Sequence, residues 1–155
     1  DSLTELLNRR GMLQRLEAST YRSFHLILAD VDFFKSINDE YGHDAGDYAL
    51  IELSKIIQTS LSEGHLASRW GGEEFVLLLA GNQDPNKELE LIRQAIASRP
   101  IETHSGPLEL TTSIGATTHL TEQQLNSRTY KKHLKSADDA LYQAKQSGRN
   151  KAVII

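Results

Sequence analysis

RWGGEEFVLLLAG, residues 69–81, joins two glycines and two glutamates to a run of apolar residues. A Gly-Gly pair is well suited to a tight chain reversal. The segments on either side, HLASRW (65–70) and EFVLLLA (74–80), have the composition of strands. The stretch therefore predicts a β-hairpin that carries the carboxylates of Glu73 and Glu74 at its tip.

Apolar spacing outside the hairpin predicts further helices and strands. FHLILADVD (24–32) is a short apolar run and indicates a buried strand, whereas YALIELSKIIQTSLSE (48–63) has the three- and four-residue spacing of an amphipathic helix. We expect an α/β fold in which helices surround a central, mostly antiparallel sheet, within one domain over residues 1–155. The other predicted elements are helices over 8–19, 33–41, 84–98 and 130–148, strands over 108–120 and 151–155, and a turn over 42–47.

Composition excludes several classes of protein and site. The 155 residues contain no cysteine, which rules out disulfides and thiolate metal sites, and the net charge of −4 does not favour nucleic acid or an anionic membrane as partner. No apolar run approaches the ~20 residues that cross a bilayer, and no signal peptide is visible. Because the chain begins without Met, we expect it to be a piece of a longer protein.

Acidic residues follow the first predicted strand as well as the hairpin turn. Asp30 and Asp32 are two positions apart, so they face the same side of a strand, where oxygen ligands could hold Mg²⁺ or Mn²⁺. The alternative is an ordinary helix cap with a solvated partner. If the hairpin lies beside this strand, Glu73 approaches Asp30, and Gly71 with Gly72 lets the backbone come close to a phosphate. Otherwise the tip is a turn with solvated acids.

Polar residues in the middle of the chain suit a nucleotide. Lys35 lies near a helix start, where it could meet a phosphate or be a plain surface lysine. Asn38 and Asp47 are the side-chain types that can pair with guanine, although Asp47 is also a good helix cap. Lys145 and Arg149 lie four residues apart at a helix end. They could bind a terminal phosphate, or they could simply complement the helix dipole.

Four ordered blocks of sequence resemble the GGDEF family of diguanylate cyclases. They are DSLTELLNRRGM at the start, ADVDFFKSINDEYGHDAGD in the middle, SRWGGEEF at the hairpin and SADDALYQAKQSGRN at the end. GGEEF is an accepted form of the family signature. The resemblance covers essentially the whole chain and implies a palm-like fold similar to that of class III nucleotidyl cyclases.

The resemblance also implies an activity and roles for individual residues. It implies condensation of two GTP into cyclic di-GMP with release of two pyrophosphates, using two Mg²⁺ or Mn²⁺ per site and two domains facing each other in a homodimer. Glu73 is the candidate that deprotonates the 3′-hydroxyl, Glu74 assists metal binding or orientation, and Asp32 has no assigned role. By position, it implies metal ligation by Asp30, the Val31 carbonyl and Glu73, guanine recognition by Asn38 and Asp47, and phosphate binding by Lys35, Lys145, Arg149 and the amides near Phe33 and Phe34.

Two positions refine these expectations. Members that also accept ATP tend to replace the acid equivalent to Asp47 with a small polar residue, so retention of Asp47 predicts GTP preference. Many relatives carry an Arg-x-x-Asp product-inhibition site before the signature, but this chain has Ser62-Glu-Gly-His65 there, which predicts no inhibition through that site. His43 has no second histidine at metal spacing, and we expect it to order the turn over 42–47.

Several alternatives stay open on the sequence. One is a catalytically silent module that binds GTP and dimerises, and retention of Asp30, Lys35, Glu73 and Glu74 argues against it. Others are a cyclase that makes another cyclic nucleotide and a two-metal nuclease. The resemblance further implies an upstream sensory domain, a cytoplasmic location that includes the cytoplasmic part of a membrane-anchored sensor, and no direct contact of this domain with a membrane.

Overall fold

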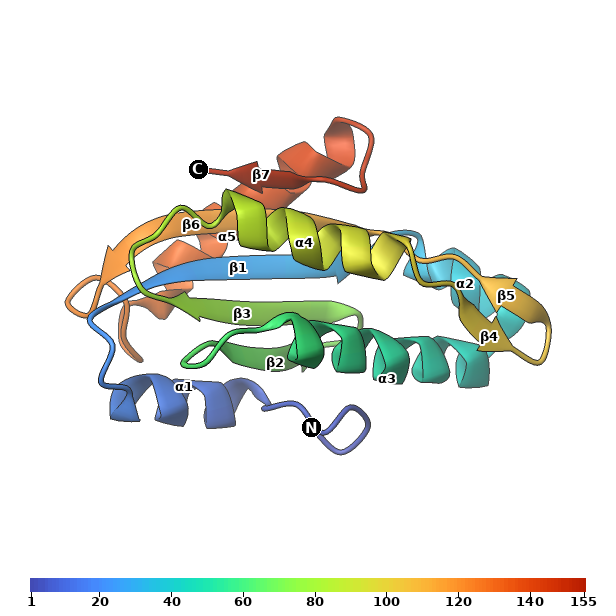
Figure 1. Ribbon diagram of the computed structural model, residues 1–155, viewed down its shortest axis with the longest axis horizontal. Coiled ribbons are helices and arrows are strands. Elements are labelled where there is room, and N and C mark those ends of the chain that lie inside the picture. The colour runs from blue at the N-terminus through green and yellow to red at the C-terminus, as the bar shows by residue number, and fades with distance from the viewer.

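The computed structural model describes all 155 residues. Five helices and seven strands alternate along the chain (Figure 1). In order they are α1 (Arg9–Ala18), β1 (Ser23–Val31), α2 (Phe34–Tyr41), α3 (His43–Ser60), β2 (Leu66–Gly71), β3 (Glu74–Ala80), α4 (Asn86–Ala97), β4 (Ile101–Thr103), β5 (Gly106–Leu108), β6 (Thr112–Thr121), α5 (Tyr130–Gln146) and β7 (Ala152–Ile154).

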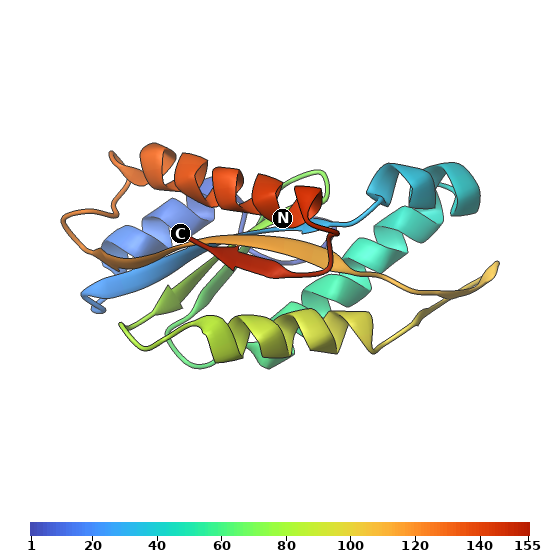
Figure 2. The ribbon, with the colours of Figure 1, turned by 90° about the horizontal axis from the view of Figure 1, so that it is seen from above.

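Five of the strands form one twisted sheet in the order β2-β3-β1-β6-β7. Every pairing in it is antiparallel except that of β6 with β7, which is parallel. Strands β4 and β5 form a separate two-stranded sheet, which Figure 2 shows projecting beyond the end of the main one. The predicted α/β fold with a mostly antiparallel central sheet is confirmed.

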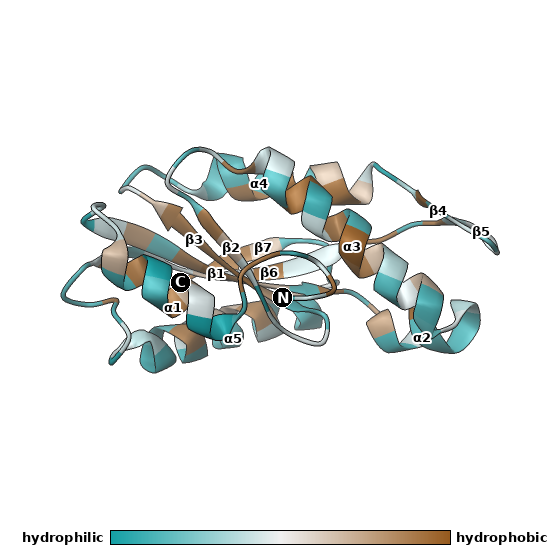
Figure 3. Cartoon of the chain, turned by 90° about the horizontal axis from the view of Figure 1, so that it is seen from below, coloured by the Kyte–Doolittle hydropathy of each residue, from teal (hydrophilic) through white to brown (hydrophobic).

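Helices cover both faces of the main sheet (Figure 2). On one face, side chains from β1 and β3, such as Ile27 and Leu77, pack with those of α3 and α4, such as Leu53 and Ile92, in the larger apolar core. On the other face, Leu26 belongs to a second core shared with α1 and α5. Figure 3 shows the apolar segments concentrated on the central strands between these helices. No helix is long and apolar enough to cross a membrane.

The predicted hairpin is present, and it lies beside the first strand. Strand β3 pairs with β2 on one side and with β1 on the other, so that Asp30 is directly opposite Glu74. Only Gly72 and Glu73 connect β2 to β3, and Gly72 has a left-handed backbone with φ of 52°. This arrangement places the hairpin tip at the end of β1, as the sequence analysis required for an acidic cluster.

Residues 42–47 differ from the prediction, because they form the first turn of α3 rather than a separate turn. The reversal is confined to Gly42, whose φ of 91° separates α2 from α3. His43 is therefore the first residue of a helix and does not order a loop. Gly46, which reads as a turn residue in the sequence, is buried inside the helix.

Further elements and boundaries differ from the sequence prediction. The strand expected over 108–120 is divided into β5 and β6, and the short strand β4 was not foreseen. Helix α4 starts at Asn86 rather than at residue 84, although the Asp84 carboxylate does accept a hydrogen bond from the Asn86 amide at 3.0 Å. These differences leave the ends of β1 and of the hairpin where they were expected.

Candidate active site

Asp30 is the acid at the centre of the candidate site. It lies at the end of β1, is 5% exposed, and its Oδ2 is 2.6 Å from Nζ of Lys145 on α5. Burial raises the pKa of Asp30 above its ordinary value, the Lys145 hydrogen bond and charge oppose this, and the charges of Glu73 and Asp32 raise it further. Lys145 and Asp30 are 115 residues apart in the sequence, and the fold alone brings them together.

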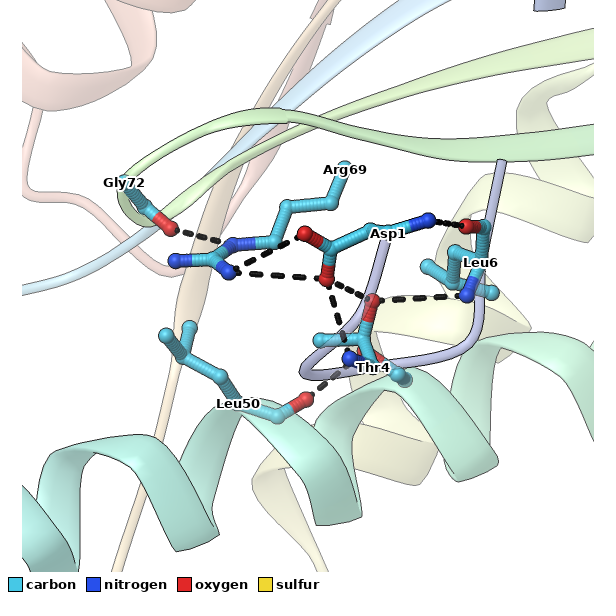
Figure 4. Close-up of polar contacts among 7 residues, drawn as sticks. Asp1, Thr4, Leu6, Leu50, Arg69 and Gly72 are labelled. Atoms are coloured by element: carbon cyan, nitrogen blue, oxygen red, sulfur yellow. Dashed lines mark hydrogen bonds and ion pairs between the residues drawn. The ribbon is translucent and has the colours of Figure 1, made fainter. Parts of the chain in front are cut away.

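The tip of the hairpin is fixed to the neighbouring elements by its backbone. The Val31 amide donates to the Glu73 carbonyl at 3.3 Å, which extends the β1–β3 pairing into the turn. The Arg69 guanidinium donates through Nε to the Gly72 carbonyl at 2.9 Å and lies 3.5 Å from the Asp1 carboxylate (Figure 4). The position of Glu73 therefore depends on backbone contacts with β1 and on Arg69.

Space remains open beside the two signature glycines. A Cβ built on Gly71 or Gly72 would meet no other atom within 4 Å. A hollow of about 460 Å³ on this part of the hairpin is lined by both glycines together with Arg9, Arg10 and Trp70 among others. A ligand can approach the backbone here without displacing a side chain.

Glu74 lies on the same side of the sheet as Asp30. Burial raises the pKa of Glu74, and the nearby carboxylates of Asp30, Asp138 and Glu73 raise it further, while Lys145 lowers it. The two acids of the signature thus have different surroundings: Glu73 is in the turn, and Glu74 is opposite Asp30 at the start of β3. The sequence already placed Glu74 in the strand over 74–80, and the structure adds that Glu74 is the residue directly opposite Asp30.

Asp32 is a buried carboxylate with a full set of hydrogen bonds. It accepts from Ser113 Oγ at 2.6 Å, from Thr111 Oγ1 at 2.6 Å and from the Asn150 amide at 3.0 Å. It therefore connects the end of β1 to the start of β6 and to the turn after α5. From the sequence, the spacing of Asp32 from Asp30 made the two acids a possible metal-binding pair or a helix cap; in the structure both Asp32 oxygens instead accept hydrogen bonds from the protein.

Phe33 and Arg149 face each other across the same end of the sheet. The Arg149 guanidinium carbon lies 4.6 Å from the centroid of the Phe33 ring, and both residues have left-handed backbones, with φ of 56° and 63°. Phe33 immediately precedes α2, whose first turn contains Phe34 and Lys35. Lys35 is exposed and forms no ion pair.

Asn38 and the start of α3 form the other side of this region. The Asn38 Oδ1 atom is buried and has no hydrogen-bond partner in the protein. Gly46 packs so closely against it that a Cβ there would lie 1.9 Å from that oxygen. Asp47, the next residue of α3, is exposed. No hydrogen bond or ion pair joins Lys35, Asn38 or Asp47 to the acids at the end of β1.

The donors at this end of the sheet suit a hard divalent cation. No group of three or more histidine, cysteine, aspartate or glutamate side chains is close enough to enclose a metal ion by itself. Asp30, Glu73 and the Val31 carbonyl would supply only oxygen ligands, and Mg²⁺ commonly binds through one or two carboxylates together with substrate phosphates and water. The charge of Glu73 raises the pKa of Asp30, and a bound cation would relieve this repulsion. The residues present therefore fit Mg²⁺ or Mn²⁺.

Residues Ser62–His65, which the sequence analysis singled out before the signature, form a compact turn. The His65 amide donates to the Ser62 carbonyl at 3.2 Å, and Gly64 between them has φ of 86°. The His65 ring accepts from the Ala80 amide through Nδ1 and lies 3.0 Å from the Glu88 carboxylate through Nε2. The His65 side chain is thus occupied by contacts within the protein.

Comparison with known proteins finds relatives that point to one family. The family model described as "Diguanylate cyclase, GGDEF domain" matches residues 1–151. Diguanylate cyclase DgcM of Escherichia coli is 39% identical over 99% of this chain, and a diguanylate cyclase of Vibrio cholerae is 34% identical over 99% of it. This chain spans 37% and 49% of those two relatives, respectively.

Solved structures agree with the sequence relatives. Diguanylate cyclase SiaD from Pseudomonas aeruginosa, solved in complex with its activator SiaC, superimposes with a TM-score of 0.88 at 39% identity, covering all of this chain and 61% of that one. The GGDEF domain of DgcB from Caulobacter crescentus, solved with c-di-GMP, gives 0.86 at 29% identity, covering 99% and 94%. By its sequence and by its fold, this chain belongs to the GGDEF family of diguanylate cyclase domains.

Proposed function

We propose that this chain condenses two molecules of GTP into cyclic di-GMP and releases two pyrophosphates. The observation that carries the proposal is the meeting of Asp30 with Lys145 and the signature hairpin at one end of the sheet, next to the start of α2. In each half-reaction a 3′-oxygen attacks an α-phosphorus, the bond to the bridging oxygen breaks, and pyrophosphate leaves. The proton of the 3′-hydroxyl passes to the Glu73 carboxylate.

Base recognition falls to the α2–α3 side of the site. A carboxylate at Asp47 accepts from two adjacent N–H groups of guanine, and an amide at Asn38 can both donate and accept. The Asn38 Oδ1 atom has no partner in the protein, which supports this assignment: such an acceptor is costly to leave unsatisfied, and rotation of the side chain toward a bound base would let a ligand N–H satisfy it. These two residues give the site its preference for GTP over ATP.

Phosphate binding falls to three cations and to the backbone near the start of α2. Lys35 and Arg149 form no ion pair with protein acids, so their charges are available to an anionic ligand. Lys145 neutralises Asp30 and would turn toward phosphate once the carboxylate has another cation. Amides near Phe33 and Phe34 add donors, and Gly71 with Gly72 leaves room for the chain of phosphates.

Asp30, Glu73 and the Val31 carbonyl would hold two Mg²⁺ or Mn²⁺ ions per site, with Glu74 helping to orient them. When bound, these ions supply charge neutralisation at the phosphates and a lower pKa for the attacking hydroxyl. The protein's own contribution is to hold the carboxylates at the strand end and hairpin tip, where Lys145 and the β1–β3 pairing fix their positions.

Catalysis requires two copies of the domain. A single domain holds one GTP, so the 3′-hydroxyl of each nucleotide can meet the α-phosphate of the other only when two half-sites face each other in a homodimer. A cytoplasmic location and an upstream sensory domain that controls this encounter belong to the same proposal. The relatives, of which this chain covers only part, are consistent with it.

One experiment tests the activity. The domain is incubated with GTP and Mg²⁺ at high protein concentration, alone and fused to a dimeric coiled coil, and cyclic di-GMP is measured by chromatography. Product in the fused form supports the proposal. Absence of product from the forced dimer, together with retained GTP binding, would instead favour the silent module that binds GTP and dimerises.

The Glu73→Gln variant tests the proposed base within this reaction. It keeps the size of the side chain and removes its charge, so we expect turnover to fall at least a thousandfold while the melting temperature stays within about 2 °C, as for a surface substitution. Activity within tenfold of the wild type would remove Glu73 from its proposed role.

A further inference from the structure

The turn that follows α5 has an unusual backbone. Gly148, Arg149 and Asn150 have consecutive positive φ values of 115°, 63° and 46°. Residues other than glycine adopt this region at a cost in free energy, so the surrounding structure must hold Arg149 and Asn150 there. Strain of this kind is concentrated at functional sites, and it raises the question of what fixes this turn.

Asp32 supplies one of the restraints. Its Oδ2 accepts from the Asn150 amide at 3.0 Å and from Thr111 Oγ1 at 2.6 Å, in a side chain that is only 3% exposed. Ser113 occupies the other oxygen at 2.6 Å. Because Asn150 is the neighbour of Arg149, this buried carboxylate ties the turn to the end of β1, while the Arg149 amide ties it to α5 by donating to the Ala144 carbonyl at 2.9 Å.

Phe33, the residue after Asp32, supplies the second restraint. Its ring is 63% exposed, so burial does not explain an aromatic residue with a left-handed backbone at this position. The ring lies under the Arg149 guanidinium, with 4.6 Å from the guanidinium carbon to the ring centroid. This is the geometry of a cation–π contact.

The nature of this contact matters for ligand binding. A carboxylate partner would occupy the N–H groups at the edge of the guanidinium, whereas an aromatic ring occupies only its face. Arg149 has no carboxylate partner, so its edge donors stay available for the bidentate pairing that guanidinium makes with phosphate. Lys145, in contrast, is already paired with Asp30 at 2.6 Å.

We propose that Asp32 and Phe33 are positioning residues that hold the Arg149 guanidinium over the Phe33 ring beside the start of α2, where its N–H groups can bind the phosphates of the bound nucleotide. Asp32 restrains the backbone of the Gly148–Asn150 turn, and Phe33 holds the guanidinium in place over its ring. The inference rests on the proposed function, since it assumes that the anion at this site is a nucleoside triphosphate.

The test is a double-mutant cycle between Phe33 and Arg149, read out by nucleotide binding rather than by activity alone. The probes are 3′-deoxy-GTP, which has no nucleophile and cannot be cyclised, and GMP, which lacks the β- and γ-phosphates. Calorimetry with Mg²⁺ gives the affinities, and GTP turnover gives KM and kcat for the same variants. Melting temperatures show that each variant is folded.

We expect Phe33→Leu to weaken binding of 3′-deoxy-GTP about three- to tenfold, the range that corresponds to loss of one cation–π contact. Phe33→Trp, which keeps an aromatic face, restores the affinity. In an Arg149→Ala background, Phe33→Leu has no further effect. GMP affinity changes less than 3′-deoxy-GTP affinity, and the effect on GTP turnover is mainly on KM. The matched control is Tyr142→Leu, which removes an exposed aromatic ring from α5 and leaves both affinities unchanged.

Asp32→Asn tests the second part. We expect it to lower the affinity for 3′-deoxy-GTP in the Arg149 protein and to have little effect in the Arg149→Ala background, because its action passes through Arg149. If Phe33→Leu or Asp32→Asn weakens binding equally with and without Arg149, or affects GMP as much as 3′-deoxy-GTP, the positioning role is wrong. If the wild-type chain binds neither nucleotide, it is the proposed function that fails.

Discussion

At the scale of single residues, the part of the site proposed to recognise the base includes a glycine inside a helix. An alanine normally favours a helix over glycine by about 1 kcal/mol. At Gly46 the new methyl group would lie 1.9 Å from Asn38 Oδ1, so the amide would have to move. At this position helix propensity therefore favours alanine, whereas the contact with Asn38 requires glycine.

We expect Gly46→Ala to raise the KM for GTP about tenfold, which corresponds to the loss of about 1.4 kcal/mol, or one good hydrogen bond. Steady-state kinetics on the forced dimer measures this change. Because the displaced group is the Asn38 side chain, adding Asn38→Ala to Gly46→Ala should cost little more. Fully additive effects of the two substitutions would show that Gly46 acts in another way.

The sequence was most informative where chemistry is local. Gly71 and Gly72 between strand-like segments predicted the hairpin, and the two-residue spacing of Asp30 and Asp32 predicted that they share a side of the sheet. The partners of Asp32 were out of reach, because Thr111, Ser113 and Asn150 are 79, 81 and 118 residues away. No local pattern marks a contact over such separations.

At the scale of the elements, α5 packs unusually closely on β6. A Cβ at Gly115 would lie 2.1 Å from the Ala137 carbonyl oxygen and 2.3 Å from the Leu141 amide nitrogen. Both are backbone atoms of α5, so the whole helix would have to move away from the sheet. The same helix carries Lys145, which connects this packing to the candidate active site.

We expect Gly115→Ala to lower the free energy of unfolding by about 2–3 kcal/mol, at the upper end of the cost of overpacking. Urea denaturation measures it. Gly11→Ala is the matched control, since a Cβ there would meet only the Asn8 and Leu7 side chains, at 3.2 Å and beyond. Equal stability of the two variants would contradict the close approach of α5 and β6.

A buried histidine links three elements at the other end of the sheet. The His25 ring meets the Gln83 carbonyl through Nε2 at 2.6 Å and accepts from the His119 amide through Nδ1 at 3.0 Å. Since an amide can only donate, Nδ1 must be unprotonated and Nε2 carries the hydrogen. Burial lowers the pKa of His25, the Gln83 hydrogen bond opposes this, His119 and His65 lower the pKa further, and Asp84 raises it.

Because the pKa of His25 is lower in the folded state, the unfolded chain binds more protons at mildly acidic pH. The contribution of His25 to stability is complete above its unfolded pKa of about 6.5 and is lost as the pH falls from there toward the folded pKa. We expect the free energy of unfolding to fall more steeply between pH 7 and 5 in the wild type than in His25→Gln. Parallel curves from urea denaturation would rule out this linkage.

Helices α2 and α3 show why the boundaries of an element are harder to predict than its existence. The sequence suggests a turn at both Gly42 and Gly46, yet only Gly42 separates two helices. Gly46 lies within α3, where close packing against Asn38 leaves room for no side chain. Strands β4 and β5 have only three residues each, and Pro107 in β5 argues against a strand when the sequence is considered alone. Short strands lack enough alternation to be recognised from the sequence.

At the scale of the whole molecule, the candidate site lies at one end of the sheet and at the starts of α2 and α3, and on the proposed function it is a half-site that a second copy completes. We therefore expect the specific rate of cyclic di-GMP formation to fall in proportion to dilution, and to become independent of concentration in the coiled-coil fusion. Initial rates over a hundredfold range of protein concentration measure this. A constant specific rate in a chain that sedimentation shows to be monomeric would contradict catalysis across two copies.

The contacts within the candidate site also differ in the sequence separation of the residues that they join. Asn38 and Gly46 meet through a contact between neighbouring helices, whereas Lys145 reaches Asp30 across 115 residues and Asn150 reaches Asp32 across 118. Domains emerge from the ribosome with the N-terminal end first, and contacts between distant residues form late. A nascent chain, or one truncated before the end of α5, would therefore contain the helices proposed to recognise the base without the groups proposed to bind the phosphates. On the proposed function, the site is complete only after α5 and the turn that follows it have left the ribosome.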